Sequence, residues 1–197
     1  MAKLLSALPV GSVVKSTNTK YNGKVIRWIV GTQDTANGRT GLVAEKMITL
    51  KCFDAKEPSN PNSNRQSYGN NRYSQSNIDQ WLNSADAAWY SARHSYDAPP
   101  NNANVWSNYN EYDTEAGFLA NFETDFRNAI LDAVIRVAKN TVTDGGGYED
   151  ITRKVFLLSN TEVGLSNENG VAEGTLWSYF SSAARRQCYP TAEAVSN

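Results

Sequence analysis

The sequence predicts an α+β domain in which an antiparallel sheet and short helices are joined by long polar loops. Residues 24–30 alternate polar and apolar side chains and then become apolar, which is typical of a β-strand. Ile78, Trp81 and Leu82 recur at the spacing of one helix face. Residues 57–71 are rich in Asn, Ser and Pro, as is common in surface loops. Together these observations favour a mixed fold.

Further strands are expected close to the first one. Residues 41–44 and 47–53 have a similar apolar composition and are expected to extend the same sheet. The connection at residues 33–39 contains Asn37-Gly38, a turn dipeptide in which two successive residues can take positive φ. A hairpin is therefore predicted here.

The short helix around Trp81 has a start signal as well as an apolar face. Ser76 or Asn77 can cap its N-terminus by accepting a hydrogen bond from a free backbone N–H. Trp81 is expected to be the buried anchor of this segment, and Trp89 is also assigned to the core.

A longer amphipathic helix is predicted over residues 117–133, because apolar side chains recur there every four residues. They are Phe118, Phe122, Phe126, Ile130 and Val134. Its apolar face is expected to pack against the core.

Three elements are predicted in the remaining part of the chain. Residues 143–147 contain three consecutive glycines and are expected to form a turn. Residues 155–159 are expected to form a short apolar strand. A short helix is expected after Gly174, where Trp177 and Phe180 supply apolar contacts. A second long loop is expected at residues 97–110.

Length and charge restrict the class of protein. A chain of 197 residues is long enough for one domain, expected to span residues 1–197. The formal net charge of −1 gives no basic surface for nucleic acid or an anionic membrane. No run approaches the roughly 20 apolar residues of a membrane span. The apolar run at residues 4–11 is interrupted by Pro9 and Gly11, so it is interpreted as a first turn and strand, without a signal peptide.

The two cysteines, Cys52 and Cys188, lie far apart in the sequence. Two cysteines without a secretion signal do not form a disulfide framework. Two buried thiols are therefore expected.

The order and spacing of several segments resemble a family of uncharacterised domains encoded in bacterial prophages and surface proteins. These segments include Asp54-Ala55-Lys56-Glu57-Pro58, residues 68–84, Trp89-Tyr90-Ser91-Ala92, residues 112–119, residues 137–141 and residues 154–159. The resemblance implies a C-type-lectin-like fold, with a twisted antiparallel sheet, short helices and long irregular loops. It also implies further strands beyond Asn197, beginning with Trp-Trp-Leu-Arg, which this chain lacks. An open sheet edge would favour pairing with another chain.

Polar groups in the loops suggest several sites, each with a simpler structural interpretation. Glu57-Pro58-Ser59 is similar to the Glu-Pro-Asn element of calcium-dependent lectins, but a second acidic segment is missing, so a structural loop is favoured. The alternating Asn60, Asn62 and Asn64 are interpreted as turn-capping residues.

Catalytic arrangements are also weak in this sequence. His94 is the only histidine, and Asp97 and Ser91 lie close to it in sequence, but no nucleophile elbow is present. Acids that lie close together in the sequence, either Asp86 with Asp97 or Glu111 with Asp113 and Glu115, offer a glycosidase hypothesis, since glycoside hydrolysis needs two carboxyl groups across a sugar. No catalytic residue, metal site or cofactor is predicted, and the chain is expected not to be an enzyme.

Exposed aromatic side chains are the strongest candidates for ligand binding, since they supply rigid contact area at low entropic cost. The predicted ligand-binding residues are Tyr96, Trp106, Tyr109 and Tyr112, which lie in or beside the loops. The last three are flanked by polar residues and are expected to be exposed.

The sequence and the resemblance together predict a non-catalytic bacteriophage or prophage virion protein, of the tail-fibre, receptor-binding or capsid-decoration kind. It would be made in the host cytoplasm and reside in the virion. The expected partners are other virion proteins, further copies of the same chain, and a host surface glycan or protein, with no nucleic acid or membrane. The alternatives are a carbohydrate-active enzyme acting on host glycans and a purely structural assembly module.

Overall fold

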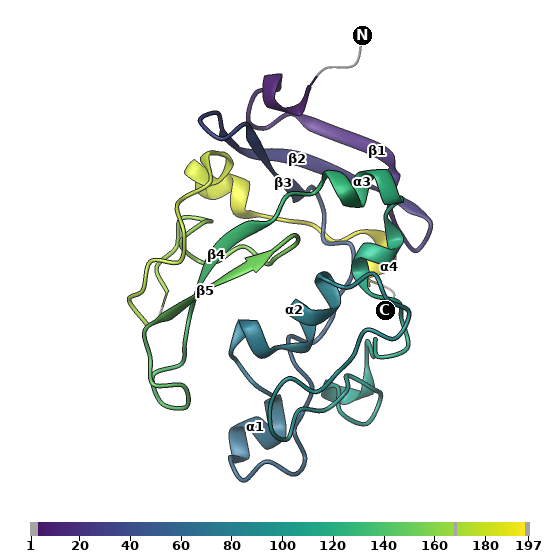
Figure 1. Ribbon diagram of the computed structural model, residues 1–197, viewed down its shortest axis with the longest axis vertical. Coiled ribbons are helices and arrows are strands. Elements are labelled where there is room, and N and C mark those ends of the chain that lie inside the picture. The colour runs from purple at the N-terminus through teal and green to yellow at the C-terminus, as the bar shows by residue number, and fades with distance from the viewer. Residues whose placement is uncertain (1–3, 168, 196–197) are drawn as a thin grey trace. The chain divides into compact units, whose positions relative to one another are not determined.

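The computed structural model describes residues 4–167 and 169–195, and the chain has a mixed α+β fold, as predicted (Figure 1). The described residues form two compact units. The two-segment unit combines residues 4–49 with residues 158–195, and the central unit comprises residues 50–157. The prediction of a single domain over residues 1–197 stays a prediction, and each unit is described by itself.

The two-segment unit is built on an antiparallel sheet in the order β1 (Val13–Tyr21), β2 (Lys24–Asp34) and β3 (Arg39–Ala44). Asn22 and Gly23 connect β1 to β2, and both have positive φ, 47° and 75°. This is the backbone that a two-residue hairpin with the right-handed twist of its strands requires. This turn was not predicted, although Asn22-Gly23 is the same dipeptide as Asn37-Gly38.

The hairpin predicted at Asn37-Gly38 is confirmed, with one difference in its backbone. Gly38 has a φ of 63°, whereas Asn37 is not among the positive-φ residues. The carboxylate of Asp34 accepts hydrogen bonds from the backbone N–H and the side-chain amide of Asn37, at 3.2 and 2.7 Å. These two hydrogen bonds hold a longer loop between β2 and β3 without a second residue of positive φ.

Two expectations about strands in this region are wrong. Residues 47–53 do not form a strand: Met47 makes only an isolated parallel bridge with Pro190, and Leu50 onwards belongs to the central unit. Leu5–Ala7 form a 3-10 helix, η1, ahead of β1. Apolar composition indicated a strand at 47–53, but among the described residues no neighbouring strand pairs with it.

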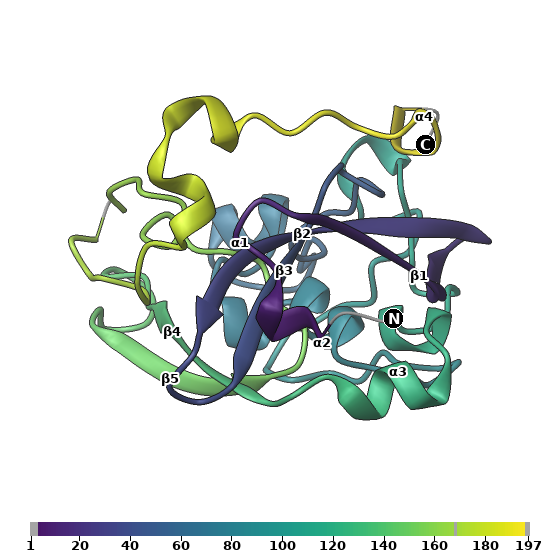
Figure 2. The same cartoon turned by 90° about the horizontal axis from the view of Figure 1, so that it is seen from above.

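The C-terminal segment of the two-segment unit consists of short turns. It contains the 3-10 helices η5 (Ser178–Ser181) and η6 (Ala183–Arg186), followed by α4 (Ala192–Val195) (Figure 2). The helix expected after Gly174 is therefore a 3-10 turn with a buried Phe180. The ring of Trp177 packs on the sheet at Gly31, where an added Cβ would lie 2.5 Å from a ring carbon. Any larger residue at this position would displace the ring.

The central unit contains short helices and a two-stranded antiparallel sheet. Its elements are α1 (Ser63–Tyr68), η2 (Tyr73–Gln75), α2 (Asn77–Leu82), η3 (Trp106–Asn108), η4 (Phe118–Asn121), α3 (Thr124–Ala129), β4 (Ala133–Ala138) and β5 (Tyr148–Arg153). The turn predicted at residues 143–147 is confirmed as the connection between β4 and β5. Most of the remaining backbone follows irregular loops.

The helix predicted around Trp81 is confirmed as α2. The Ser76 hydroxyl accepts the N–H of Asp79 at 3.3 Å, which is the predicted N-terminal cap. All six residues of α2 are buried, and the side chain of Trp81 is only 1% exposed. A helix of this length is marginal in water, so burial against the surrounding loops must stabilise it.

Aromatic rings form the core next to α2. The ring of Trp81 lies 5.7 Å from that of Tyr112 and 5.2 Å from that of Phe118. Trp89 stacks on Tyr112 with centroids 5.4 Å apart. Both indole N–H groups donate to backbone oxygens, Trp81 to Ala116 at 3.0 Å and Trp89 to Tyr112 at 3.1 Å. The assignment of both tryptophans to the core is confirmed.

The long helix predicted over residues 117–133 is wrong. This segment is divided into η4, the separate helix α3 and the start of β4, and Phe122 between the first two is extended. The N–H groups of Gly117 and Leu119 donate to the carbonyls of Asp86 and Ser84, at 2.9 and 3.0 Å. These hydrogen bonds to a loop distant in sequence take the place of the backbone hydrogen bonds of a continuous helix. The apolar residues with four-residue spacing therefore do not lie on one helix face.

The strand predicted at residues 155–159 is also wrong, since β5 ends at Arg153. Beyond β5, side-chain oxygens accept the hydrogen bonds of the backbone N–H groups. The side-chain oxygen of Asn83 accepts the N–H groups of Lys154 and Val155 at 3.0 and 3.2 Å, and the Tyr73 hydroxyl accepts that of Leu157 at 3.1 Å. The apolar run therefore packs as a loop.

Neither cysteine is in a disulfide. Cys52 is partly buried and Cys188 is exposed, so the expectation of two buried thiols is wrong for Cys188. Burial raises the pKa of the Cys52 thiol to about 11, which keeps it protonated at neutral pH. Within residues 4–167 and 169–195, no helix has the length and apolar character needed to cross a membrane.

Candidate functional site

Exposed aromatic side chains gather on the loops of the central unit. The rings of Tyr68 and Trp106 stack, with centroids 5.8 Å apart and planes inclined by 28°. The side chains are nonetheless 66% and 64% exposed, and Tyr109 is 69% exposed. The ammonium of Lys56 lies 5.7 Å from the Trp106 ring centroid. We call Tyr68, Trp106, Tyr109 and Lys56 the aromatic loop surface.

The loop that carries Trp106 is held in an unusual backbone conformation. Ser107, Asn108 and Asn110 all have positive φ, between 55° and 61°. Non-glycine residues adopt this region rarely and at an energetic cost, and such residues concentrate at functional sites. Val105, which is fully buried, anchors the loop next to Trp106. The backbone therefore presents Trp106 outward at some cost in stability.

The four predicted ligand-binding residues differ in how exposed they are. Trp106 and Tyr109 belong to the aromatic loop surface, and Tyr96 is 50% exposed with a φ of 69°. Tyr112 is fully buried, so its expected exposure is wrong. Its hydroxyl donates to the carbonyl of Cys52 at 2.9 Å, and its ring packs on Trp89. The polar residues beside Tyr112 in the sequence led to the prediction that it is exposed, although it is a core residue.

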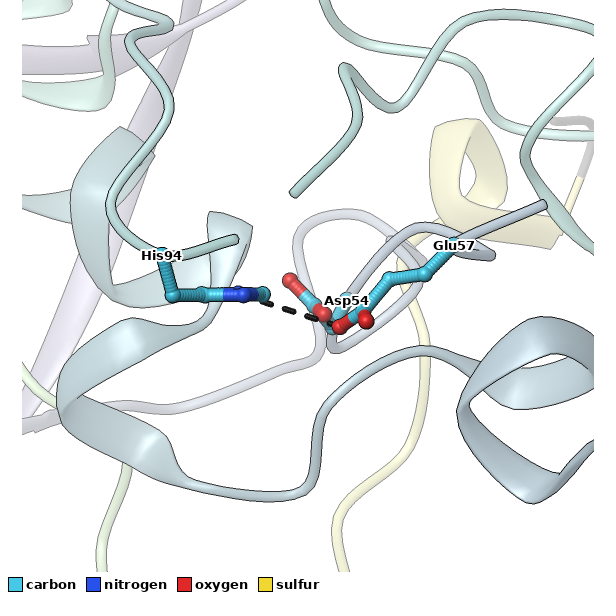
Figure 3. A group of neighbouring side chains, drawn as sticks. All are labelled: Asp54, Glu57 and His94. Atoms are coloured by element: carbon cyan, nitrogen blue, oxygen red, sulfur yellow. Dashed lines mark ion pairs between the residues drawn. The ribbon is translucent and has the colours of Figure 1, made fainter. Parts of the chain in front are cut away.

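A second group of polar side chains is enclosed within the central unit. Asp54, Glu57 and His94 each offer a ligand atom, and these atoms all lie within 4.8 Å of one another (Figure 3). Asp54 and Glu57 are 5% and 0% exposed, and the His94 side chain is 10% exposed. We call these three residues the carboxylate–histidine cluster. Burial of two carboxylates is costly unless other groups compensate their charge.

Backbone hydrogen bonds place Asp54 in this cluster. Its two carboxylate oxygens accept the N–H groups of Asn70 and Asn77, at 2.6 and 2.8 Å. The chain passes very close here: a Cβ on Gly69 would lie 2.3 Å from the carbonyl oxygen of Ala55. Gly69 also has a φ of 78°, so both space and backbone conformation require glycine at this position.

Asn60, three residues after Glu57, holds the Glu57 carboxylate in place. The side-chain amide of Asn60 donates to Glu57 Oε2, and the Glu57 N–H donates to the carbonyl of Arg65 at 3.2 Å. Asn62 caps α1, accepting the N–H groups of Asn64 and Arg65. The interpretation of Asn60 and Asn62 as turn-capping residues is therefore confirmed. The expected surface loop, in contrast, buries Glu57 in its interior.

Burial dominates the electrostatics of Asp54. It raises the pKa of this carboxyl group to about 7, against the effect of the bonds from Asn70 and Asn77. The negative charge of nearby Asp97 raises this pKa further, whereas His94 lowers it. The protonation state of Asp54 therefore changes close to neutral pH, and a buried carboxyl group with a strongly shifted pKa is a candidate for a functional role.

The catalytic arrangement considered for His94, Asp97 and Ser91 does not assemble. His94 Nε2 lies 3.9 Å from Asp97 Oδ1, which is too long for a hydrogen bond. Ser91 instead accepts a 2.7 Å hydrogen bond at its hydroxyl oxygen from the side-chain amide of Gln80. Among the scattered acids, Asp86 and Glu111 remain exposed.

Sequence reasoning missed Asp54 as a site residue and did not connect Glu57 with His94. Asp54 and Glu57 are three residues apart, but His94 reaches them only through the path of two irregular loops. The only local signal was the acid pair around Ala55 and Lys56, which resembles many exposed loops.

Comparison with curated proteins and with solved structures gave no match. Residues 37–197 match a protein family described as a domain of unknown function, DUF6273. The matched region contains β3, the entire central unit and the C-terminal segment, and so includes both the aromatic loop surface and the carboxylate–histidine cluster. Because this match covers most of the chain, the protein belongs to the DUF6273 family.

Proposed function

We propose that the protein is a non-catalytic recognition module that binds ligands through the aromatic loop surface. The observation that carries this proposal is the stacked pair of Tyr68 and Trp106, whose side chains are about two-thirds exposed on a conformationally strained loop. Large aromatic side chains are normally buried where packing allows it. A pair kept in solvent supplies an apolar face with little rotamer entropy to lose on binding.

The chemistry of this surface suits a surface glycan of a bacterial host. The flat face of a sugar ring carries C–H groups that pack on an aromatic ring, and its hydroxyls need polar partners at the rim. Lys56 and the polar side chains of Asn102 and Asn108 lie in or beside this loop and supply hydrogen-bonding groups. Because aromatic stacking does not require burial of charge, the interaction suits a neutral polysaccharide.

The absence of catalysis is proposed from the location of the titratable groups. Glu57 and Asp54 are enclosed, so a polysaccharide cannot bring a glycosidic bond within hydrogen-bond reach of their oxygens. Exposed Asp150 forms a bidentate ion pair with Arg136, at 2.9 and 3.0 Å, and Arg136 holds its pKa below the usual range. A general acid needs the opposite shift.

We also propose that the recognition module is a C-type-lectin-like scaffold of phage or prophage origin and resides in the virion, as a tail-fibre, receptor-binding or capsid-decoration protein. The resemblance of its segments to prophage-encoded domains supports this origin. The small antiparallel sheets, short helices and long loops of the chain are compatible with a lectin-like scaffold. A purely structural module would use the same aromatic loop surface against a neighbouring subunit.

Binding without turnover is the expected result when the purified chain is incubated with host surface polysaccharide. The polysaccharide should retain the protein in a pull-down, and the number of free reducing ends should stay constant. Tyr68→Ala should weaken retention, whereas Tyr189→Ala should not, since Tyr189 is equally exposed but lies in the other unit. Release of reducing ends, abolished by an Asp or Glu substitution, would establish the enzymatic alternative.

Self-association or docking in the virion is the second expected property. The outer strands β1 and β3 of the three-stranded sheet and both strands of the β4–β5 pair lie at sheet edges, where backbone groups can pair with another chain. Sedimentation equilibrium at micromolar concentration should show dimers or larger species, or the chain should co-sediment with virion particles. A monomer that fails to associate with virions would refute this part of the proposal.

A further inference from the structure

We propose that Asp54, Glu57 and His94 form a buried binding site for a divalent transition-metal ion, with Zn²⁺ as the representative ion. This inference goes beyond the proposed recognition function and does not depend on it. It rests on two side-chain atoms that lack hydrogen-bond partners, on the tautomer of His94 and on the separation of the ligand atoms.

The hydrogen bond at Nδ1 determines the tautomer of His94. Nδ1 lies 3.0 Å from the carbonyl oxygen of Ser95, which can only accept, so Nδ1 carries a proton. In the neutral imidazole, Nε2 then has a lone pair and no proton. Nε2 points toward the carboxylates of Asp54 and Glu57 (Figure 3). The arrangement therefore directs one lone pair toward other electron-rich atoms.

Within the part of the chain that the structure describes, Glu57 Oε1 and His94 Nε2 are buried and have no hydrogen-bond partner. They lie 3.8 Å apart. A buried carboxylate oxygen without a partner carries its full desolvation cost. A cation placed between these atoms would satisfy both, and its two positive charges would offset the negative charges of Asp54 and Glu57.

A proton on Nε2 is the competing explanation. The resulting imidazolium would donate from Nε2, but the distances to Glu57 Oε1 and Asp97 Oδ1, 3.8 and 3.9 Å, exceed those of a hydrogen bond. The geometry thus favours an ion that is larger than a proton.

The distances between the ligand atoms of the cluster fit a shared small metal ion better than a direct hydrogen bond. Zinc binds imidazole nitrogen and carboxylate oxygen at about 2.0–2.2 Å in tetrahedral geometry, which places neighbouring ligand atoms about 3.4 Å apart. The Nε2 to Oε1 separation of 3.8 Å is close to this value, and all three ligand atoms lie within 4.8 Å of one another. The Asp54 carboxylate would supply the third ligand atom.

The groups behind each ligand are those that support metal sites. Metal-binding histidines commonly donate their second ring N–H to a backbone carbonyl, as His94 does to Ser95. Asn60 holds Glu57 Oε2, which leaves Oε1 available, and Asn77 orients Asp54. An imidazole ligand favours zinc and its neighbours, whereas calcium prefers six to eight oxygen ligands.

Isothermal titration of the metal-free chain with Zn²⁺ tests the site. Cys188→Ser is introduced in every protein, because the exposed thiol would otherwise bind zinc itself. We expect one zinc per chain, and at least a tenfold loss of affinity in Glu57→Gln and in His94→Gln. Glu162→Gln is the matched control, since Glu162 is also buried but lies in the other unit, and its affinity should be unchanged.

Cobalt absorption gives a second readout that does not depend on the heat signal. Co²⁺ bound by one nitrogen and two or more oxygens should produce visible d–d bands in the parent protein, and Glu57→Gln should lose them while retaining its circular dichroism spectrum. Titration with Ca²⁺ should show much weaker binding. Absence of zinc binding by the parent protein, or equal zinc affinity in Glu57→Gln and the parent, would overturn the proposal and leave a protonated His94 as the explanation.

Discussion

Trp81→Ala should destabilise the central unit by about 3–5 kcal/mol, the usual cost of removing a buried aromatic side chain. Its ring is 1% exposed and contacts Tyr112 and Phe118, and its indole N–H donates to Ala116. The substitution leaves both a cavity and an unsatisfied carbonyl. Chemical denaturation followed by circular dichroism measures the change in the free energy of unfolding.

Trp106→Ala is the matched control for this experiment, because the same side chain is removed from an exposed position. Its effect on stability should stay below about 1 kcal/mol. If Trp81→Ala had the same denaturation midpoint as the parent protein, the placement of Trp81 in the aromatic core would be wrong.

Asp79→Asn should have the second largest effect, a loss of about 3–5 kcal/mol, because it breaks a buried ion-pair network. Asp79 is fully buried at the first turn of α2 and accepts two 2.6 Å hydrogen bonds from Arg153 and one of 2.8 Å from Arg93. The asparagine keeps the shape of the side chain but leaves both guanidinium groups without their counter-charge. The midpoint of urea denaturation should fall accordingly.

Asp150→Asn provides the comparison for Asp79→Asn. Asp150 also forms two hydrogen bonds to an arginine, Arg136, but its side chain is 43% exposed. Exposed ion pairs contribute about 0–1 kcal/mol. Equal destabilisation by the two substitutions would show that burial of Asp79 has no special role in holding β5 to α2.

The parts of the fold that could be predicted from the sequence depend on local interactions. The Ser76 cap and the face formed by Ile78, Trp81 and Leu82 lie within one short segment, and the prediction of α2 is confirmed. The Asn37-Gly38 hairpin is confirmed for the same reason. Each depends on hydrogen bonds between residues only a few positions apart, which residue types alone can indicate.

The elements that were predicted wrongly depend on distant partners. The phenylalanines at 118, 122 and 126 have helical spacing, but the backbone near Gly117 bonds to Ser84 and Asp86. Similarly, Asn83 replaces a neighbouring strand for residues 154–155. In this loop-rich unit, side chains supply many of the hydrogen bonds that the backbone needs. The spacing of apolar residues therefore does not indicate a regular helix or strand.

The candidate sites also differ in whether neighbouring or distant residues determine them. Exposure of Trp106 and Tyr109 was predicted from their polar neighbours and is confirmed, but the same reasoning failed for Tyr112. The carboxylate–histidine cluster joins Asp54 to His94 across forty positions of sequence. Only the path of the loops brings them together, and no pattern in one sequence specifies that path.

Equilibrium binding of Trp106→Ala to host surface polysaccharide tests the recognition function most directly. Because truncation of a central tryptophan at an interface commonly costs about 2 kcal/mol or more, we expect its affinity to fall at least tenfold below that of the parent protein. Trp106→Phe, which keeps a stacking ring, should retain most of the affinity. Equal affinities of Trp106→Ala and the parent protein would contradict the assignment of the aromatic loop surface as the recognition site.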